Sequence, residues 1–319
     1  MWEVFNKQIN EGEKRQLWCE PTPGYRIPIT VVNGANPGKT VMIIAGTHSM
    51  ENPAIPAVTR VAKEIDPAKT NGRVIIVHTM TWSSIWERHI RFVVEDHGNL
   101  NGVYPGRADG TVSERIAYFF ATKICPQCDF ILDFHSGAAG QPLDTLIFFP
   151  RKEGVREISL EVSMKLGVTH LIESGSSTGI YSYAANYLGV PGIILERGTG
   201  GFSKPEWVDE DERDAKRVLN HFGVYDFGDQ GPVPNKILCT KCNDINADAE
   251  GFWIPEIEMY GRYKKGDRIG YIQDIWGNKI KECFFDCDCM VYYYTDAPTI
   301  KPGWMLCTIG VDGCMNPID

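Results

Sequence analysis

Residues that could bind a metal ion follow two apolar segments of the chain. His48 and Glu51 lie three residues apart in AGTHSMEN, directly after the apolar run TVMIIAG. His135 ends a second apolar run in FILDFHSG, and small residues follow it. A catalytic zinc ion takes three protein ligands from nitrogen and carboxylate oxygen and leaves a fourth position for water. The three side chains therefore predict a catalytic metal site, although His48 and Glu51 also fit an ordinary polar turn between a strand and a helix.

Hydrolysis at such a site also needs a base that takes a proton from water and returns it to the leaving group. Glu196 ends the apolar run GIILE and precedes the small-residue loop RGTGG, which makes it the candidate base. The alternative is a salt bridge between Glu196 and Arg197. A developing oxyanion needs a fixed cation or donor. The candidates flank the polar loop EDHGNLNGVYPGR and are Arg88, Arg91 and Arg107.

The segments that carry these residues predict an α/β fold with a mostly parallel sheet. The apolar runs are short, rich in β-branched residues and apolar at odd and even positions, as in strands covered on both faces. Helical patterns separate them, at 53–65, after the capping box Thr111-Val-Ser-Glu114, and from Pro205 onward. Ligands of such sheets bind at the carboxyl ends of strands. The expected strands are 40–46, 73–80, 129–135, 145–150 and 192–198.

The pattern changes near residue 228. The segment GDQGPVPNK is rich in Gly and Pro and predicts a linker. Beyond it, short strand-like runs separated by turn residues replace the helical period. KGDRIG at 265–270 weakly resembles KPGWMLCTIG at 301–310, as expected for two related β-hairpin units packed face to face. We therefore expect a catalytic domain at 1–231 and a small all-β domain at 232–319.

The composition favours a globular cytoplasmic protein. The 319 residues are 43% hydrophobic and 23% charged, and the net charge of −9 comes without a lysine- or arginine-rich run. This charge argues against nucleic acid and membrane surfaces as partners. The sequence contains no apolar signal core and no stretch of about 18 apolar residues. We therefore expect the chain to be cytoplasmic.

Ten cysteines include two CxxC pairs, CPQC at 125–128 and CTKC at 239–242. A zinc ribbon joins its two pairs over roughly 15–20 residues, and these pairs lie more than a hundred positions apart. Reduced thiols are therefore expected here in place of a structural zinc or a redox pair.

Taken in order, the motifs resemble those of the succinylglutamate desuccinylase/aspartoacylase family, zinc amidohydrolases related to the zinc carboxypeptidases. AGTHSMEN resembles the family's GxHGxE, RFVVEDHGNLNGVYPG resembles its arginine, aspartate and NLNRxFPG, and LDFHSG and ILERG follow. GFWIPEIEMYGRYKKGDRIGYIQDIWGN resembles the terminal β-domain of the branch that includes N-acetyl-diaminobutyrate deacetylases. The resemblance implies a three-layer, zinc-carboxypeptidase-like α/β domain with a mostly parallel or mixed sheet, and a barrel-sandwich-like β-domain.

The resemblance also implies a role for each candidate. Glu196 matches the general base and acid, and Arg91 matches the arginine that polarises the scissile carbonyl and steadies the oxyanion. Asp133 could orient a metal ligand. The residues that match the ligands of one Zn²⁺ per chain are His48, Glu51 and His135.

Substrate binding departs from the family pattern. Asn101 matches the asparagine of NLNR that binds substrate, but the following arginine is Gly102 here. In the family that arginine grips a substrate carboxylate with a planar fork, which glycine cannot do. Another arginine could replace it, with Arg107 and Arg197 as the nearest candidates, or the substrate lacks a carboxylate there. Loss of activity is a third alternative, and the retained Glu196 and metal ligands argue against it.

The sequence thus predicts a zinc-dependent deacylase that cleaves the amide of a small N-acylated amino acid or amine. The terminal domain has no Met-Lys pair to carry a cofactor, so it would narrow access to the site or mediate assembly into a homo-oligomer. One alternative is a zinc carboxypeptidase acting on short peptides, which Gly102 disfavours. The other is a non-catalytic metal- or ligand-binding relative.

Overall fold

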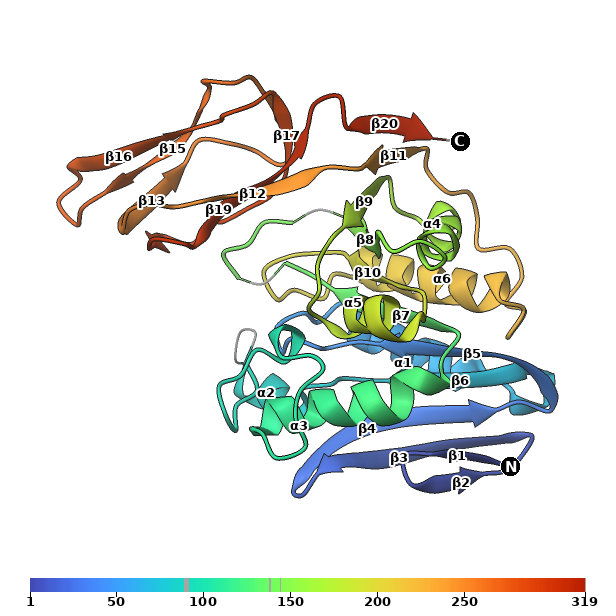
Figure 1. Ribbon diagram of the computed structural model, residues 1–319. Helices are drawn as coiled ribbons and strands as arrows, with labels where there is room; N and C mark the ends of the chain where they lie inside the picture. Colours follow the sequence, from blue (N-terminus) through green and yellow to red (C-terminus); the bar gives the residue numbers. More distant parts are fainter. Residues whose placement is uncertain (89–91, 138, 144, 319) are drawn as a thin grey trace.

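A computed structural model describes residues 1–88, 92–137, 139–143 and 145–318. The chain forms an α/β lobe and a smaller lobe of β-strands that overhangs one side of it (Figure 1). Among the described residues, no helix has the length and apolar character needed to span a membrane. The described cysteines are all unpaired.

Within the described residues, ten strands form one mixed sheet in the order β20-β11-β9-β8-β10-β7-β5-β6-β4-β3. β6, β5, β7 and β10 are parallel neighbours, and β8 runs antiparallel to β10. The strands are β3 (Glu13–Thr22), β4 (Tyr25–Asn33), β5 (Asn36–Ile44), β6 (Asn71–Val77), β7 (Phe130–His135), β8 (Leu146–Pro150), β9 (His170–Ser174), β10 (Gly192–Glu196), β11 (Lys236–Cys239) and β20 (Met315–Ile318). A separate hairpin joins β1 (Trp2–Val4) and β2 (Lys7–Ile9).

Helices cover both faces of this sheet, which explains why its central strands carry apolar residues on both faces. Val41 and Ile43 of β5 face the core shared with α1, α4 and α6, whereas Met42 and Ile44 face the core shared with α3 and α5. The helices are α1 (Ala54–Glu64), α2 (Trp82–Glu87), α3 (Val112–Phe119), α4 (Arg156–Met164), α5 (Ile180–Tyr183) and α6 (Pro205–His221). Short helical turns are η1 (Pro67–Lys69), η2 (Leu100–Gly102), η3 (Phe120–Ile124), η4 (Cys125–Gln127) and η5 (Ala184–Leu188).

In the described part of 232–319, two four-stranded antiparallel sheets pack around a core that includes Trp253, Ile272 and Ile309. The two segments that resemble each other lead into β15 and β19, one in each sheet. The strands are β12 (Cys242–Asn246), β13 (Gly251–Pro255), β14 (Arg262–Tyr263), β15 (Arg268–Gln273), β16 (Lys279–Phe284), β17 (Cys289–Tyr294), β18 (Thr299–Ile300) and β19 (Met305–Val311).

The predicted fold class is confirmed: an α/β domain carries a small all-β domain. The five expected strands correspond to β5, β6, β7, β8 and β10, and the capping box at Thr111 and Glu114 is present. β11 and β20, although they lie within 232–319, pair with each other and extend the large sheet through β9. Both ends of the expected β-domain are thereby fastened to the α/β lobe.

Candidate metal centre

His48, Glu51 and His135 meet beyond the carboxyl ends of β5 and β7, which are adjacent parallel strands. His48 and Glu51 lie in the segment that connects β5 to α1, and His135 is the last residue of β7. One possible ligand atom from each residue lies within 4.8 Å of the others, and all three side chains are buried. The fold therefore brings together two positions that are 84 or more residues apart in the chain.

The donor atoms of this group fit a divalent metal ion. Glu51 Oε1 lies 2.6 Å from His48 Nδ1, and Glu51 Oε2 lies 2.8 Å from His135 Nδ1. Glu51 Oε2 is nevertheless buried without a well-aligned hydrogen bond. Burial alone would raise the pKa of Glu51, but the neighbouring His48 and His135 hold that pKa below its usual range. A buried carboxylate between two imidazole nitrogens is a three-ligand set of the kind that catalytic zinc uses.

Polar side chains contact both imidazole rings at Nε2, the ring nitrogen that does not contact Glu51. His48 Nε2 lies 3.0 Å from Asn99 Oδ1, and His135 Nε2 lies 3.0 Å from Asp133 Oδ2. Thr47 donates a hydrogen bond of 3.1 Å to the other Asp133 oxygen. Contacts of this kind fix the orientation and tautomer of ligating histidines, and here they leave both Nδ1 atoms directed at Glu51. Asn99 was not among the residues expected from the sequence, although it lies within the NLN motif.

Glu196 ends β10 directly beside the metal centre. It is in register with His135 on the neighbouring parallel strand, and adjacent strands are about 4.8 Å apart. Glu196, His135 and the other two candidate ligands line one cavity of about 560 Å³. Glu196 therefore shares one cavity with the three candidate ligands.

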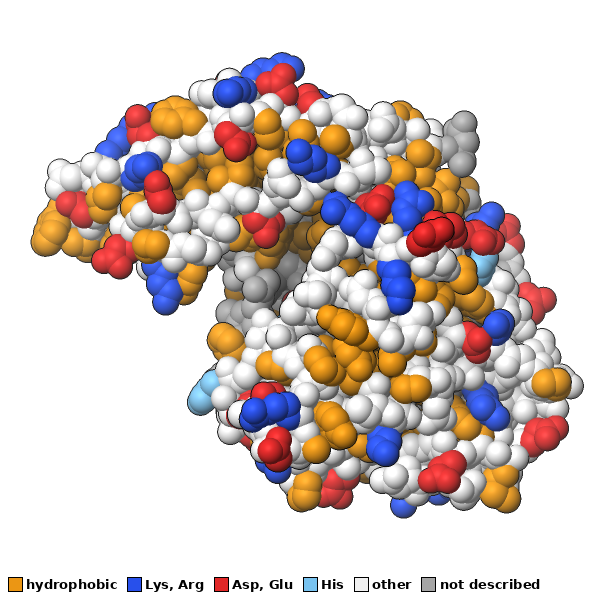
Figure 2. Space-filling model, viewed as in Figure 1, with side chains coloured by type: hydrophobic (Ala, Val, Ile, Leu, Met, Phe, Trp, Pro, Cys, Tyr) orange, Lys and Arg blue, Asp and Glu red, His pale blue; other side chains and the backbone are white. Residues whose placement is uncertain are grey.

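The cavity lies between the two lobes. Figure 2 shows the molecule hollowed where the β lobe overhangs the α/β lobe. The β lobe supplies one wall of the cavity, through Cys242, Asp244, Tyr293, Met305 and Thr308.

The β lobe also holds the segment that follows His135. Tyr260 donates a hydrogen bond of 3.0 Å to the carbonyl oxygen of Thr145, and the Asp296 amide donates one of 2.8 Å to the carbonyl oxygen of Gly140. Leu143 and Tyr293 form an isolated antiparallel β-bridge. Because this segment borders the cavity, the β lobe is part of the site and narrows access to it.

Of the residues expected to bind substrate, Asn101 lines the cavity and Arg107 does not. Asn101 lies in η2, where its backbone N–H donates a hydrogen bond of 3.1 Å to Asn99 Oδ1. The Arg107 side chain is 67% exposed and lies 3.4 Å from Glu114 and 3.9 Å from Asp109. The expectation for Arg107 is therefore corrected: its guanidinium lies on the surface, engaged with carboxylates. Arg91, the expected oxyanion-stabilising residue, lies outside the described residues.

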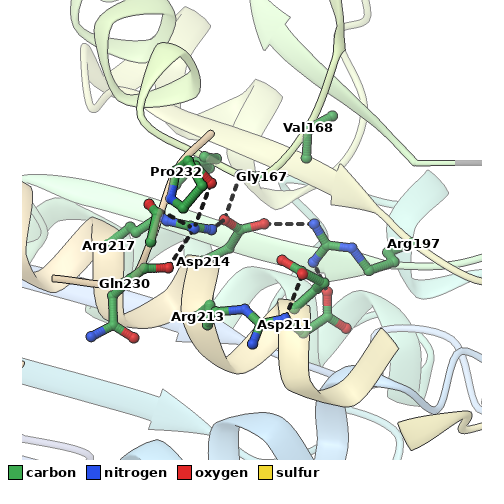
Figure 3. A network of polar contacts seen from close by, with 12 residues as sticks. Gly167, Val168, Arg197, Asp211, Arg213, Asp214, Arg217, Gln230 and Pro232 are labelled. Carbon is green, nitrogen blue, oxygen red and sulfur yellow. Dashed lines mark hydrogen bonds and ion pairs between the residues drawn. The ribbon is translucent and has the colours of Figure 1, made fainter. Parts of the chain in front are cut away.

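Arg197 requires the same correction, because it lies in a buried ionic network (Figure 3). Its guanidinium donates hydrogen bonds of 2.5 Å to Asp211 and 2.6 Å to Asp214, both on α6. The Arg197 side chain is 2% exposed and does not line the cavity. Arg217 shares Asp214 at 2.8 Å. Arg197 thus ties the loop after Glu196 to α6 and is not available to a substrate.

The cavity instead contains an arginine that the sequence did not point to. Arg151, the residue after β8, lines the cavity with Glu173 at the end of β9. The only signal in the sequence was its position directly after an apolar strand. That signal was weak because β8 is antiparallel to β10, a direction that the sequence does not show.

The chain is similar in sequence and in fold to proteins of one known family. The family model of the succinylglutamate desuccinylase/aspartoacylase catalytic domain matches residues 37–222. The N-alpha-acetyl-L-2,4-diaminobutyric acid deacetylase of Halomonas elongata is 32% identical over 205 residues, which are 62% of this chain and 58% of that protein. The match thus spans less than two thirds of the relative's length.

Two solved structures share the fold. One is the ectoine utilization protein EutE (DoeB) from Ruegeria pomeroyi, with a TM-score of 0.79 and 23% identity over 90% of this chain and 89% of that one. The other is a succinylglutamate desuccinylase/aspartoacylase from Rhodobacter sphaeroides, with a TM-score of 0.80 and 19% identity over 98% of each chain. Both similarities extend through the α/β lobe and into the β lobe.

Proposed function

Because the chain belongs to the succinylglutamate desuccinylase/aspartoacylase family, we propose that it is a zinc-dependent deacylase that hydrolyses the amide bond of a small N-acylated amino acid or amine. The observation that carries the proposal is the buried group of His48, Glu51 and His135, which shares one cavity with Glu196. The relative from Halomonas elongata is named for a reaction on an N-acetylated amino acid, which is the same class of substrate.

We assign one zinc ion per chain to this group, because two imidazole nitrogens and one carboxylate oxygen are a usual catalytic zinc set. When bound, zinc supplies a Lewis acid that polarises water and the amide carbonyl. His48, Glu51 and His135 would hold it, and Asn99 and Asp133 would keep the two rings in the required orientation.

Glu196 acts in this proposal as the general base and then as the general acid. Its carboxylate takes a proton from the attacking water and delivers that proton to the departing amine. Its place beside His135 on the adjacent strand supports the role. Arg91 is assigned, by family resemblance alone, to the negative charge that develops on the carbonyl oxygen. Asn101, on the cavity wall, is assigned to substrate binding.

A small substrate suits the cavity better than a polypeptide does. Its volume of about 560 Å³ lies within the roughly 300–1,000 Å³ usual for small-molecule sites, and the β lobe closes one side. We also propose a cytoplasmic setting, without nucleic acid or membrane as a partner, in keeping with the net charge of −9. Assembly into a homo-oligomer through the β-domain at 232–319 stays a prediction.

The experiment that tests this function is a substrate panel on the zinc-loaded protein. N-acyl amino acids, N-acyl amines and free and blocked dipeptides are offered, and a chelator-treated sample is the control. We expect release of free amines from acyl compounds, with loss of release after chelation. A preference for dipeptides with a free carboxyl end would indicate a carboxypeptidase. Stoichiometric zinc without hydrolysis of any compound would indicate a non-catalytic relative.

A further inference from the structure

The end of the cavity away from the metal centre carries two charged side chains that the mechanism does not use. Arg151 follows β8, Asp244 lies on β12 of the β lobe, and both line the cavity. β8 runs antiparallel to β10, with Leu146 opposite Glu196. Arg151 directly follows Pro150, at the end of β8 that points away from Glu196. A group bound at Arg151 therefore lies farther along β8 than an amide bound beside Glu196.

Backbone carbonyls hold the Arg151 guanidinium in place. Its Nη2 donates hydrogen bonds of 3.2 Å to the carbonyl oxygen of Glu173 and 3.1 Å to that of Thr240. Its Nη1 lies over Gly175, 3.4 Å from the position that a Cβ atom there would take. The Glu173 carboxylate is 3.9 Å from Arg151 Nε and is shared with Arg156 at 3.2 Å. Arg151 is thus positioned mainly by neutral acceptors, and its charge can still serve an anion.

Asp244 presents a carboxylate from the opposite wall. Thr308 donates a hydrogen bond of 2.6 Å to its Oδ1. Among the described residues, no ion pair joins Asp244 to Arg151 or to another cation. Burial chiefly raises the pKa of the Cys242 thiol; Cys239 and Asp244 raise it further, and the Arg151 charge opposes part of this rise. Arg151 and Asp244, both described residues, therefore line one cavity without forming an ion pair with each other.

Three apolar side chains, Phe148, Ile172 and Met305, line the same cavity. Phe148 of β8 is in register with Ile194, two residues before Glu196, and Ile172 of β9 lies next to it across the sheet. Met305 contributes from the β lobe. A hydrocarbon chain that lies against these side chains removes apolar surface from water.

We propose that Arg151 and Asp244 bind the carboxylate and the ammonium group of a free amino-acid head, so that the preferred substrate is an amino acid acylated on its side-chain amine. The inference rests on the proposed deacylase function. Hydrolysis adds water across the amide, breaks the C–N bond, and yields a carboxylate and the free amino acid. In Nε-acyl-lysine or Nδ-acyl-ornithine the amide would lie at the metal centre and the methylene chain against the apolar side chains Phe148, Ile172 and Met305. The zwitterionic head would then lie at Arg151 and Asp244.

An amino acid acylated on its α-amine fits this cavity less well. Its carboxylate lies next to the scissile amide, where Gly102 offers no guanidinium. Its α-nitrogen is already part of the amide and carries no positive charge for Asp244. In such a compound only a charge on the side chain or on the acyl group could reach Arg151 or Asp244, and the pair would not bind the amino-acid head.

The first test compares positional isomers with the same acyl group. The zinc-loaded full chain is given Nε-acetyl-lysine, Nα-acetyl-lysine and the corresponding pair of acetylornithines, and kcat/KM is measured. We expect kcat/KM to be at least about tenfold higher for the side-chain isomers, a difference of about 1.4 kcal/mol. Equal values, or a preference for the α isomers, overturn the inference.

The outcomes separate the inference from the function on which it rests. Hydrolysis of other acyl compounds in the wider panel, with none of the side-chain isomers, overturns the inference and leaves the deacylase proposal standing. No hydrolysis of any compound overturns the deacylase proposal and the inference with it.

The second test uses Arg151→Met and Asp244→Asn, with Arg262→Met and Asp248→Asn as matched surface controls outside the cavity. We expect each cavity variant to raise KM for the side-chain isomers about tenfold or more, with little change in kcat and little effect on the α isomers. Inhibition by free lysine, the product, should weaken in parallel. If Arg151→Met melts early, Asp244→Asn at its exposed position keeps the test open. Unchanged KM and unchanged lysine inhibition in Asp244→Asn overturn the inference.

Discussion

At the metal end of the cavity, His48, Glu51 and His135 are buried and are held by other side chains, whereas at the far end Arg151 and Asp244 are held by carbonyls and a hydroxyl. The first arrangement fixes the geometry of a ligand set. The second fixes the positions of two charges but leaves them unneutralised by each other. In our proposal the first arrangement serves the hydrolysis and the second serves selection among substrates.

Two arginines near the site show the same difference. Arg197 donates hydrogen bonds to two buried carboxylates, whereas Arg151 donates to two carbonyl oxygens and has only a longer contact of 3.9 Å with the Glu173 carboxylate. Proximity in sequence to Glu196 therefore says little about function. The partners of the guanidinium decide its role, because a carboxylate cancels its charge and a carbonyl oxygen does not.

The largest effect, on metal content and on hydrolysis, is expected from removing one of the candidate metal ligands. His48→Ala removes one of three ligands, and we expect the protein to lose both bound zinc and hydrolysis. Elemental analysis of the purified variant checks the metal content. His221→Ala, which alters a half-buried histidine outside the cavity, should retain the metal. Full zinc content in His48→Ala would refute the ligand assignment.

The contrast between the two arginines predicts a large loss of stability at one of them. Arg197→Met leaves Asp211 and Asp214 buried without this partner, and we expect the free energy of unfolding to fall by about 3–5 kcal/mol. Denaturant unfolding measures it, with the half-exposed Arg213→Met on the same helix as the control. If Arg197→Met left the free energy of unfolding unchanged and raised KM, Arg197 would be a substrate-binding residue and not a structural one.

A smaller effect, on zinc affinity, is expected from changing Asp133, which contacts the candidate ligand His135. Asp133→Asn keeps the shape of the side chain that faces His135 Nε2 but removes its charge. We expect zinc affinity to weaken about 10- to 100-fold, as measured by competition with a chromogenic chelator. Asp129→Asn, just before the other end of β7, pairs with Lys39 and is the matched control. Equal affinities in the two variants would remove Asp133 from the metal centre.

The smallest effect concerns the β lobe. Tyr260→Phe removes the hydrogen bond to the carbonyl oxygen of Thr145, which contributes about 1 kcal/mol. We expect a few-fold increase in KM with little change in kcat, because the segment after His135 is held less firmly. Tyr225→Phe, which loses a surface hydrogen bond to Glu64, should behave as wild type. Identical kinetics in both variants would limit the β lobe to a passive wall.

The central strands and the ligand positions could be predicted from the sequence because both depend on local patterns. β5, β7 and β10 are apolar on both faces, and the polar residues at their ends necessarily converge on one edge of a parallel sheet. The other five strands of the sheet, β3, β4, β9, β11 and β20, were not among those expected. β3 carries charged residues on its exposed positions and β9, HLIES, is short and partly polar, whereas β4 is apolar and was missed although its pattern is that of a buried strand.

The substrate end could not be predicted in this way, because it depends on partners that are distant in the chain. Arg197 pairs with residues 14 and 17 positions later, whose burial on α6 is a property of the packed fold. Arg151 reaches the cavity only because β8 runs antiparallel to β10, and one of its two carbonyl partners belongs to Thr240, just before β12. No local sequence pattern predicts the pairing of Arg197 with α6 or the position of Arg151 in the cavity.

Glu196→Gln tests the central claim most directly, because it removes the base and leaves the three ligands intact. Zinc content and the hydrolysis of the best N-acyl substrate are measured on the same preparation. The account predicts one zinc ion per chain, as in the wild type, and turnover reduced by a factor of about 10²–10⁴. Full zinc content with turnover equal to that of the wild type would contradict it.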